Sequence, residues 1–308
     1  MENLIHIREA VTEKDICTFW TELRRYQERD LFPDPEDGEL AYFLSNEYRE
    51  QVEALHDRCE DPLHYLFFCR DGQDIGMAMP VIYRNEDGKC FILEFCVFPA
   101  FRENGTGSRC AEELLRWSAE RGAAYWELNC NTDQRRRFWS RLGFLSNGAD
   151  EWGEPLMLRP PVEKLPVHVE LLTDGADRQL LRLENSFLAE VGEEPLSAKK
   201  ERRLAEAVAD GKIFFFLAKR GYRAVGLCSV SPCYSTFACA ESGVFDDFFI
   251  EPAFRHQGIA RLLVSAARNW AEENALSGLT VGCADGDAEM YRALGFAARL
   301  GTMLAMNL

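Results

Sequence analysis

Residues 99–107 read PAFRENGTG, and residues 252–260 read PAFRHQGIA. The first four letters recur 153 positions apart (252 − 99), and the same offset pairs Trp117 with Trp270. Each stretch follows an apolar run and precedes a segment whose apolar residues have helical spacing. The chain therefore contains an internal repeat, and this repeat decides its architecture.

The glycines of the two stretches suit an anion-binding loop. Positions without a side chain, such as Gly105, Gly107 and Gly258, let the backbone approach an anion closely. The unpaired N–H groups of the following helical turn point at the anion with the positive end of the helix dipole. One such loop is also compatible with a helix start that packs on a glycine. Two copies in matched strand-loop-helix contexts favour a pyrophosphate site.

The halves converge again further along, where residues 141–144 read RLGF and residues 292–296 read RALGF. Between the halves, residues 158–166 contain three prolines, which continue neither a helix nor a central strand. This segment is therefore predicted to be a linker. We expect two domains, residues 1–160 and 165–308, each of ordinary domain size.

Hydrophobic periodicity predicts a similar order of elements in both halves, with helices first and a hairpin of strands next. In the first half we expect helices at 15–29 and 39–58 and strands at 64–69, 76–83 and 90–98. In the second half we expect helices at 177–191 and 198–209 and strands at 213–219, 224–231 and 244–250. The fold class is α/β or α+β, with a mixed sheet in each domain.

Composition and charge restrict the environment and the partners. The 308 residues hold no apolar run near the roughly 20 that a membrane span needs. The first residues, MENLIHIREAVTEKD, lack the regions of a signal peptide, so we expect a soluble, cytoplasmic protein without a membrane partner. The formal charge of −16 disfavours nucleic acid as a partner. It suits a cationic acceptor such as an amine, although acidic surfaces also serve solubility alone.

The eleven cysteines are scattered without CxxC pairs, which suits reduced thiols better than a disulfide framework. The nearest cluster, Cys228, Cys233 and Cys239, has no histidine nearby. We therefore expect core thiols and no metal site.

The order of a strand, an R-x-x-G-x-G/A loop, a helix, a strand and an aromatic residue before L-G-F resembles the acyl-CoA-binding signature of the GNAT superfamily of N-acetyltransferases. The resemblance covers nearly the whole chain twice. It implies two tandem GNAT-like domains, each a mixed, mostly antiparallel twisted sheet flanked by helices. It also implies acetyl-CoA as cosubstrate, with the pantetheine arm in a gap between splayed strands and the pyrophosphate on the loop N–H groups.

The cofactor-binding residues that the resemblance implies lie in and just before the two loops. In the first half they are Arg102, Glu103, Asn104, Gly105, Thr106 and Gly107, with the backbone of Cys96 and Val97. In the second half they are Arg255, His256, Gln257, Gly258, Ile259 and Ala260, with the backbone of Phe249 and Ile250.

The halves differ where the chemistry would occur. Tyr291 matches the family pattern in which a tyrosine hydroxyl protonates the departing CoA thiolate, whereas the first half has Trp139 at this place. An indole N–H donates a hydrogen bond but does not act as a proton-transferring acid. The alternative for Tyr291 is an aromatic residue that only packs.

An amine with a pKa near ~10 is mostly protonated at neutral pH, so its attack on a thioester needs a base. Asp246 and Asp247 fall on the strand before the second loop, on opposite faces of an extended chain. Glu94 aligns with Asp247 at the same offset of 153 (247 − 94). We expect Asp247, less so Asp246, and Glu94 to serve as base or amine-binding carboxylate. The alternative is that they pair with a buried arginine.

The sequence therefore predicts an N-acetyltransferase that transfers an acetyl group to a small-molecule or peptide amine by direct attack in a ternary complex. The second half is the expected catalyst. The first half would bind CoA, either as a structural domain or as a separately active one. One alternative is a non-catalytic acyl-CoA sensor, and another is a peptide or protein acetyltransferase whose domains jointly frame a cleft.

Overall fold

The computed structural model describes residues 4–34, 38–150, 152–161, 163 and 165–301. The chain divides into two compact units, each with one sheet. The first unit comprises residues 1–146 and 155–162, and the second comprises residues 147–154 and 163–308. The short segment 147–154 thus groups with the second unit, a detail that the proline-rich linker did not suggest.

The sheet of the first unit has seven strands in the order β1-β2-β3-β4-β5-β7-β6, and its last strand, β6, crosses the boundary between the units at residue 147. Within the described part of the sheet, β4 and β5 are parallel, whereas β1–β2, β2–β3, β3–β4 and β5–β7 are antiparallel, so the sheet is mixed and mostly antiparallel. Its elements are β1 (His6–Glu9), α1 (Glu13–Tyr26), the π-helical η1 (Gln27–Leu31), α2 (Gly38–Phe43), α3 (Asn46–His56), β2 (Leu66–Arg70), β3 (Gln73–Tyr83), β4 (Lys89–Val97), the 3₁₀ turn η2 (Pro99–Phe101), α4 (Thr106–Ala119), β5 (Tyr125–Asn129), α5 (Asp133–Arg141), β6 (Leu145–Ala149) and β7 (Pro155–Arg159).

The second unit repeats this plan with five strands in the order β12-β11-β10-β9-β8, of which β11 and β12 are parallel. Its elements are β8 (Val167–Leu171), α6 (Arg178–Val191), α7 (Ala198–Ala209), β9 (Phe214–Arg220), β10 (Arg223–Ser235), β11 (Ala240–Ile250), the 3₁₀ turn η3 (Pro252–Phe254), α8 (Ile259–Glu273), β12 (Leu279–Val281), the 3₁₀ turn η4 (Asp285–Asp287) and α9 (Ala288–Ala293). The prediction of two tandem domains, each with a mixed sheet flanked by helices, is confirmed.

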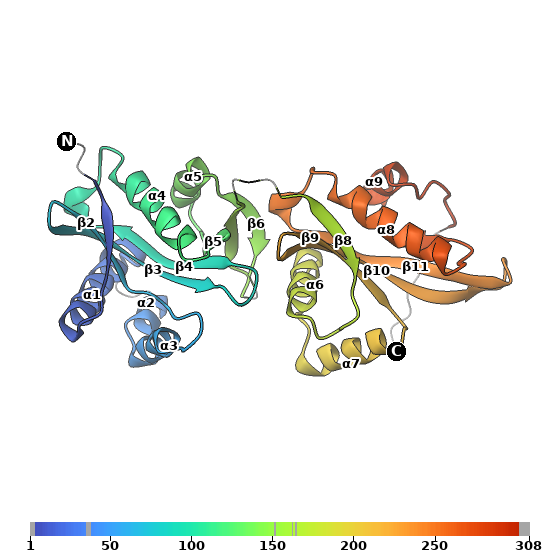
Figure 1. The fold of residues 1–308 in the computed structure, drawn as a ribbon, viewed down its shortest axis with the longest axis horizontal. Helices are drawn as coiled ribbons and strands as arrows, with labels where there is room; N and C mark the ends of the chain where they lie inside the picture. The colour runs from blue at the N-terminus through green and yellow to red at the C-terminus, as the bar shows by residue number, and fades with distance from the viewer. Residues whose placement is uncertain (1–3, 35–37, 151, 162, 164, 302–308) are drawn as a thin grey trace. The chain divides into compact units, whose positions relative to one another are not determined.

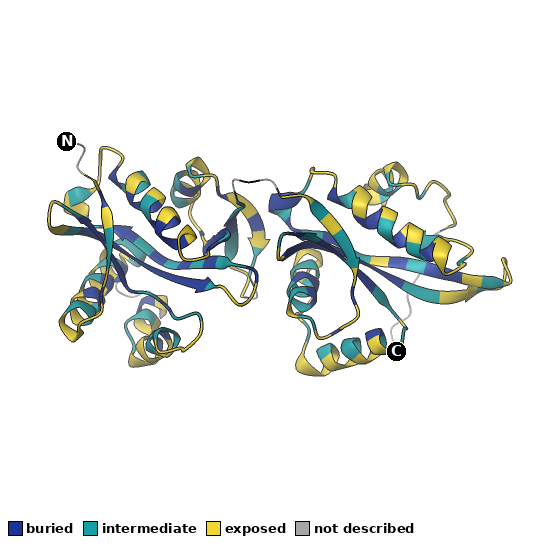
Figure 2. Ribbon diagram, in the orientation of Figure 1, coloured by how far each residue is buried: buried dark blue, intermediate teal, exposed yellow. Residues whose placement is uncertain are grey.

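Helices cover both faces of each sheet. In the first unit α4 and α5 lie on one face and α1 to α3 on the other, and in the second unit α8 and α9 lie opposite α6 and α7 (Figure 1). Because side chains alternate along a strand, Leu66 and Phe68 of β2 pack against α4, whereas Phe67 packs against α1 and α3. The strands are accordingly buried along much of their length, while the helices are exposed on their outer sides (Figure 2).

One predicted helix is wrong. The periodicity of residues 39–58 predicted a single helix, but the chain forms α2 and α3 with a break at Ser45. Ser45 is extended (φ −75°, ψ 158°), and its Oγ accepts a hydrogen bond from the backbone N–H of Tyr48 at 3.1 Å. A serine in this geometry is an N-cap, which starts a new helix.

In each unit the strand before the loop separates from its parallel neighbour. Residues 89–91 of β4 pair with β5, yet β4 continues to Val97. Residues 243–245 of β11 pair with β12, and β11 continues to Ile250. The backbone edge of the last residues of β4 and β11 therefore faces a gap in the sheet.

Gly226 lies where β10 passes the end of β11. A Cβ atom at this position would stand 2.9 Å from the carbonyl oxygen of Phe249, which is a backbone atom and cannot rotate away. We expect Gly226→Ala to lower the free energy of unfolding by about 1–3 kcal/mol, measured by urea denaturation. Gly286→Ala is the matched control, because no atom lies within 4 Å of a Cβ there. Equal stability of the two variants would contradict this prediction.

Candidate functional site

The two long helices that follow the repeated motif begin differently from their neighbours. Helices α1, α3, α5, α6 and α7 each start with a Thr, Ser or Asp side chain that accepts a hydrogen bond from a first-turn N–H. Helices α4 and α8 start with Gly105 and Gly258, in the left-handed conformation at φ 73° and 83°, and have no side-chain cap. The N–H of Thr106 donates to the carbonyl oxygen of Glu103 and that of Arg261 to the carbonyl oxygen of Gly258, which leaves the other first-turn N–H groups to an external anion.

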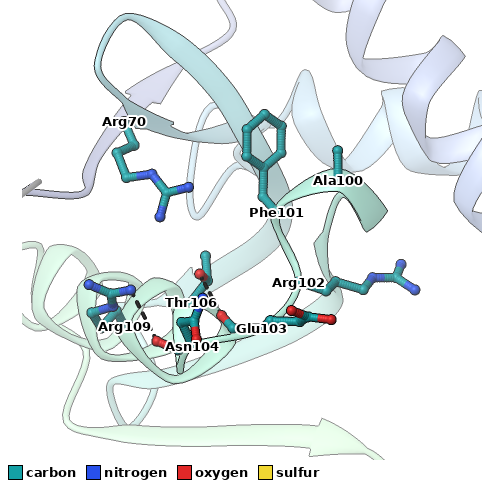
Figure 3. A pocket seen from close by; sticks show the side chains of 8 residues that line it. All are labelled: Arg70, Ala100, Phe101, Arg102, Glu103, Asn104, Thr106 and Arg109. Carbon is teal, nitrogen blue, oxygen red and sulfur yellow. Dashed lines mark hydrogen bonds between the residues drawn. The ribbon is translucent and has the colours of Figure 1, made fainter.

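A hollow of about 480 Å³ lies at the first of these helix starts. It is lined by Arg70, Ala100, Phe101, Arg102, Glu103, Asn104, Thr106 and Arg109. Arg70 and Arg109 lie on the same side of the loop, whereas Arg102 extends away from them (Figure 3). Two guanidinium groups beside uncapped backbone N–H groups give this hollow the chemistry of a phosphate site.

Arg102 and Arg255, predicted to bind the cofactor, make matching contacts within their own units. Arg102 Nε donates to the carbonyl oxygen of Val97 at 2.8 Å, and Arg255 Nε donates to that of Ile250 at 2.9 Å. The Arg102 guanidinium also forms a bidentate pair with Asp30 (2.9 and 2.7 Å), which raises the arginine pKa.

The corresponding partner of Arg255 is Glu190. Both guanidinium groups therefore fix the start of the loop to the strand before it and to a helical segment that lies between the first two strands of the unit. The geometry gives these two side chains a positioning role.

A further arginine at an equivalent position in each unit was not predicted from the sequence. Arg70 lies 5.8 Å from the ring centroid of Phe101, and Arg220 lies 5.3 Å from that of Phe254. Both arginines end the strand that precedes a tight turn, so the structural repeat extends to them. Arg220 also donates to Gln257 Oε1 at 2.9 Å and so holds the second loop.

The remaining loop residues take different environments. Glu103 (φ 111°), Asn104 (φ 50°) and His256 (φ 60°) adopt positive φ and are exposed. Thr106 is buried, with its hydroxyl donating to the carbonyl oxygen of Glu103 at 2.9 Å, and Ile259 is buried in the core. The four strand residues pair with the neighbouring antiparallel strand on their other side: Cys96, Val97, Phe249 and Ile250.

Glu94 is buried on β4, with 9% of its surface exposed. Burial raises the pKa of its carboxyl to about 8, and the positive charge of Arg135 on α5 opposes that shift. The phenols of Tyr26 and Tyr48 are close enough for Glu94 to raise their pKa values further, beyond the effect of burial. Glu94 thus occupies an interior site shared with two tyrosines and one arginine.

Asp247 and Asp246 occupy an irregular part of β11, where the register with β10 shifts. Asp246 is exposed, while Asp247 is half-buried with φ 49° and accepts a hydrogen bond from Ser229 Oγ at 2.6 Å. Burial raises the pKa of Asp247, the serine hydroxyl opposes the shift, and Asp246 adds to it. The carboxyl of Glu184, which the sequence analysis missed, lies close enough to both for their charges to raise its pKa.

Tyr291 lies on α9 with its ring 5.9 Å from Phe248 and 5.9 Å from Phe296. Burial, with contributions from acidic neighbours including Asp246, raises the pKa of its hydroxyl to about 12. Trp139 has the equivalent neighbours in the first unit, at 5.1 Å from Phe95 and 5.0 Å from Phe144. The second unit therefore brings Tyr291 near Asp246, the residue before Asp247, and the first unit has an indole at the place of the phenol.

Among the described residues, no group of three His, Cys, Asp or Glu side chains is placed to hold a metal ion. Within the same part of the chain, no helix combines the length and the apolar character that crossing a membrane requires.

Two regions of the chain, residues 20–144 and 178–296, match the model of the acetyltransferase (GNAT) family. Similar solved structures include an aminoglycoside acetyltransferase from an uncultured soil metagenomic sample, in complex with trehalose (18% identity, 46% of this chain, 95% of that chain, TM-score 0.41). Another is a predicted acetyltransferase with acetyl-CoA from Clostridium acetobutylicum (18% identity, 46% of this chain, 96% of that chain, TM-score 0.40). A third is a transcriptional regulator from Bacillus halodurans C-125 (24% identity, 46% of this chain, 100% of that chain, TM-score 0.41). No curated protein matches the chain.

Proposed function

This chain belongs to the GNAT acetyltransferase family, and on that premise we propose that it transfers an acetyl group from acetyl-CoA to a primary amine by direct attack in a ternary complex. The second unit is the catalytic one. The observation that carries this assignment is that Tyr291, a phenol, lies between Phe248 and Phe296 at the place where the first unit has the indole of Trp139 between Phe95 and Phe144. The functional domains are residues 1–160 and 165–308, and the site of action is the cytoplasm.

The residues present fit acetyl-CoA. The uncapped N–H groups at the starts of α4 and α8 would receive the pyrophosphate, and Arg70 and Arg109 would pair with phosphate oxygens in the first unit. The pantetheine arm would follow the backbone edge that β4 and β11 leave unpaired beyond Phe91 and Phe245. Acetyl-CoA supplies a thioester whose carbonyl carbon an amine nitrogen can attack.

The side chains of the second unit divide the proton transfers between them. Asp247 takes a proton from the amine, and a carboxyl with a raised pKa is better matched to this task than an ordinary one. The new C–N bond forms as the C–S bond breaks, Tyr291 gives its hydroxyl proton to the departing sulfur, and the second proton that the nitrogen loses on becoming an amide restores the hydroxyl. The hydroxyl of Ser229 orients Asp247.

The first unit binds acetyl-CoA without performing the same reaction. Trp139 is buried in an aromatic cluster and offers no acidic proton at the place of Tyr291. Glu94 keeps a carboxyl at the place of Asp247, so the two units share a possible base and differ in the acid. A non-catalytic acyl-CoA sensor is the competing proposal, since Tyr291 also packs between two phenylalanines.

The cofactor sites can be tested separately with isosteric pairs of variants. Asp and Asn both tolerate the left-handed backbone of Gly258, so Gly258→Asp and Gly258→Asn differ only in a negative charge at the helix start. We expect the Asp variant to bind acetyl-CoA at least about tenfold more weakly than the Asn variant, measured by calorimetric titration. Gly105→Asp and Gly105→Asn test the first unit in the same way.

Two binding events in the wild type, each weakened by its own Asp substitution, would support two cofactor domains. One event that responds only at Gly258 would make the first unit a scaffold. No binding at all would overturn the acyltransferase proposal. Turnover with a panel of amines is best followed by the ultraviolet absorbance of the thioester, because exposed thiols such as Cys233 and Cys283 would react with a thiol reagent.

A further inference from the structure

Glu184 is a buried carboxyl on the face of α6 that packs against the sheet. Its helical neighbours Leu180, Leu183 and Phe187 belong to the hydrophobic cluster of the second unit. Only 7% of the Glu184 surface is exposed, and its Oε2 atom has no hydrogen-bond partner among the described residues. Burying a carboxyl oxygen without a partner is costly, so this atom needs a ligand or a proton.

Three acidic side chains of decreasing exposure lie near one another at this position. Asp246 is exposed, Asp247 is half-buried, and Glu184 is buried. Burial first, and then the charges of Asp247 and Asp246, raise the pKa of Glu184 to about 8. Two neighbouring buried carboxyls do not both ionise unless a positive charge joins them.

Among the described residues, none of the groups that shift the pKa of Glu184 or Asp247 carries a positive charge. From β10, Ser229 donates to Asp247, and the buried Cys228 thiol lies near the same carboxyl. From α9, Tyr291 lies near Asp246.

Two arginines at α6, one on the helix and one that contacts it, have carboxylate partners of their own. Arg182 pairs with Glu251, and Arg255 pairs with Glu190. In the first unit, by contrast, the carboxyl of Glu94 has the positive charge of Arg135 beside it.

We propose that Glu184, together with Asp247 and with Asp246 at the entrance, recognises an ammonium group, and that the acceptor is therefore an amine with at least two amino groups. This inference rests on the proposed function and names its substrate class. One amino group loses its proton to Asp247 and attacks the thioester. The other stays charged and neutralises Glu184, which becomes ionised as the acceptor binds.

The site therefore links binding to proton release. In the free protein at pH 7, Glu184 is mostly protonated, because its pKa lies near 8. A bound ammonium favours the ionised form, so the proton leaves, and affinity for the diamine increases as the pH rises toward 8. A site without a carboxyl that titrates near neutral pH would release no proton when the diamine binds.

The experiment compares putrescine, a diamine, with butylamine, which has one amino group on the same carbon chain. We expect wild-type kcat/KM to favour putrescine about tenfold or more. Glu184→Gln, isosteric with the protonated side chain, should remove most of this preference through a higher KM for putrescine. Glu273→Gln, on the exposed surface of α8, is the matched control and should behave as wild type.

Calorimetric titration of putrescine in the presence of CoA gives a readout independent of turnover. In buffers of different ionisation enthalpy, wild type should release a proton on binding and Glu184→Gln should release less. Equal turnover of the two amines, or an unchanged KM of the variant for putrescine, would overturn the ammonium site while acetyl transfer stands. Absence of turnover with Glu184-dependent putrescine binding would instead reject the enzyme and keep the site, and absence of both would reject both.

Discussion

Replacing Tyr291 with phenylalanine is expected to lower kcat about 10²- to 10⁴-fold and to leave the affinity for acetyl-CoA unchanged. The reason is that the CoA thiolate leaves more easily when its sulfur receives a proton as the C–S bond breaks. Burial raises the pKa of this hydroxyl to about 12, so Tyr291 remains protonated through the neutral range and keeps the proton to give. Steady-state kinetics together with calorimetric titration of acetyl-CoA measure the two quantities.

The substitution removes only the hydroxyl, so the ring contacts with Phe248 and Phe296 persist. Tyr222→Phe, at a side chain of the same unit that is 83% exposed, is the matched control and should retain wild-type kcat. If Tyr291→Phe turned over as fast as wild type, Tyr291 would be a packing residue. The acid would then have to be sought elsewhere or the sensor proposal adopted.

Glu251→Gln is expected to lower the free energy of unfolding of the second unit by about 3–5 kcal/mol. The Glu251 carboxylate receives hydrogen bonds from Arg223 at 3.0 and 2.7 Å and from Arg182 at 2.7 Å. Arg223 is only 1% exposed, so the variant removes a negative charge that contacts a buried guanidinium. Urea denaturation followed by a probe in the second unit measures the loss.

Glu170→Gln is the control, because Glu170 pairs with Lys219 at a much more exposed site. Its effect should stay within about 1 kcal/mol. A similar loss for both variants would mean that burial does not determine the strength of the Glu251 network.

The same network predicts a pH dependence. Burial alone would raise the pKa of Glu251, but Arg182 and Arg223 overcome this effect and lower the pKa to about 2. Since the folded-state pKa lies below the unfolded one, the stabilisation is present above the unfolded pKa and is lost as the pH falls toward 2. It amounts to about 3 kcal/mol, and wild type should lose it between about pH 5 and pH 2, whereas Glu251→Gln should not.

The sequence predicted the parts of the fold that depend on local patterns. The repeated glycine-rich loops and their flanking strands and helices lie where the periodicity placed them, because alternating and helical apolar spacing reports which side of an element is buried. The break at Ser45 was missed because α2 and α3 present a continuous helical pattern, and only the cap geometry interrupts it. The short β1 and β8 carry too few residues for a clear alternation.

The site was predicted less completely than the fold. The sequence identified Tyr291, Asp247 and both loops as candidates, since each lies within or at a fixed offset from the repeat. Glu184 was missed because a glutamate on an amphipathic helix is normally exposed, and its burial follows from how α6 packs on the sheet. The stacking of Arg70 on Phe101 joins residues from separate elements, a contact that no local pattern reports.

The two copies make the same backbone hydrogen bond before the loop but pack different side chains there. Phe98 and Glu251 occupy the same offset before the loop, and their N–H groups donate to Ile75 and Val225 at 2.9 and 3.0 Å. The first copy places an apolar ring there, and the second places a carboxylate among arginines. If the strand-loop-helix segments were exchanged between the copies, Arg182 and Arg223 would face a phenyl ring in place of the Glu251 carboxylate. In the other half of the chimera, a carboxylate would lie among the apolar neighbours of Phe98. The two copies therefore share an order of elements without sharing an interior that would accept the other copy's segment.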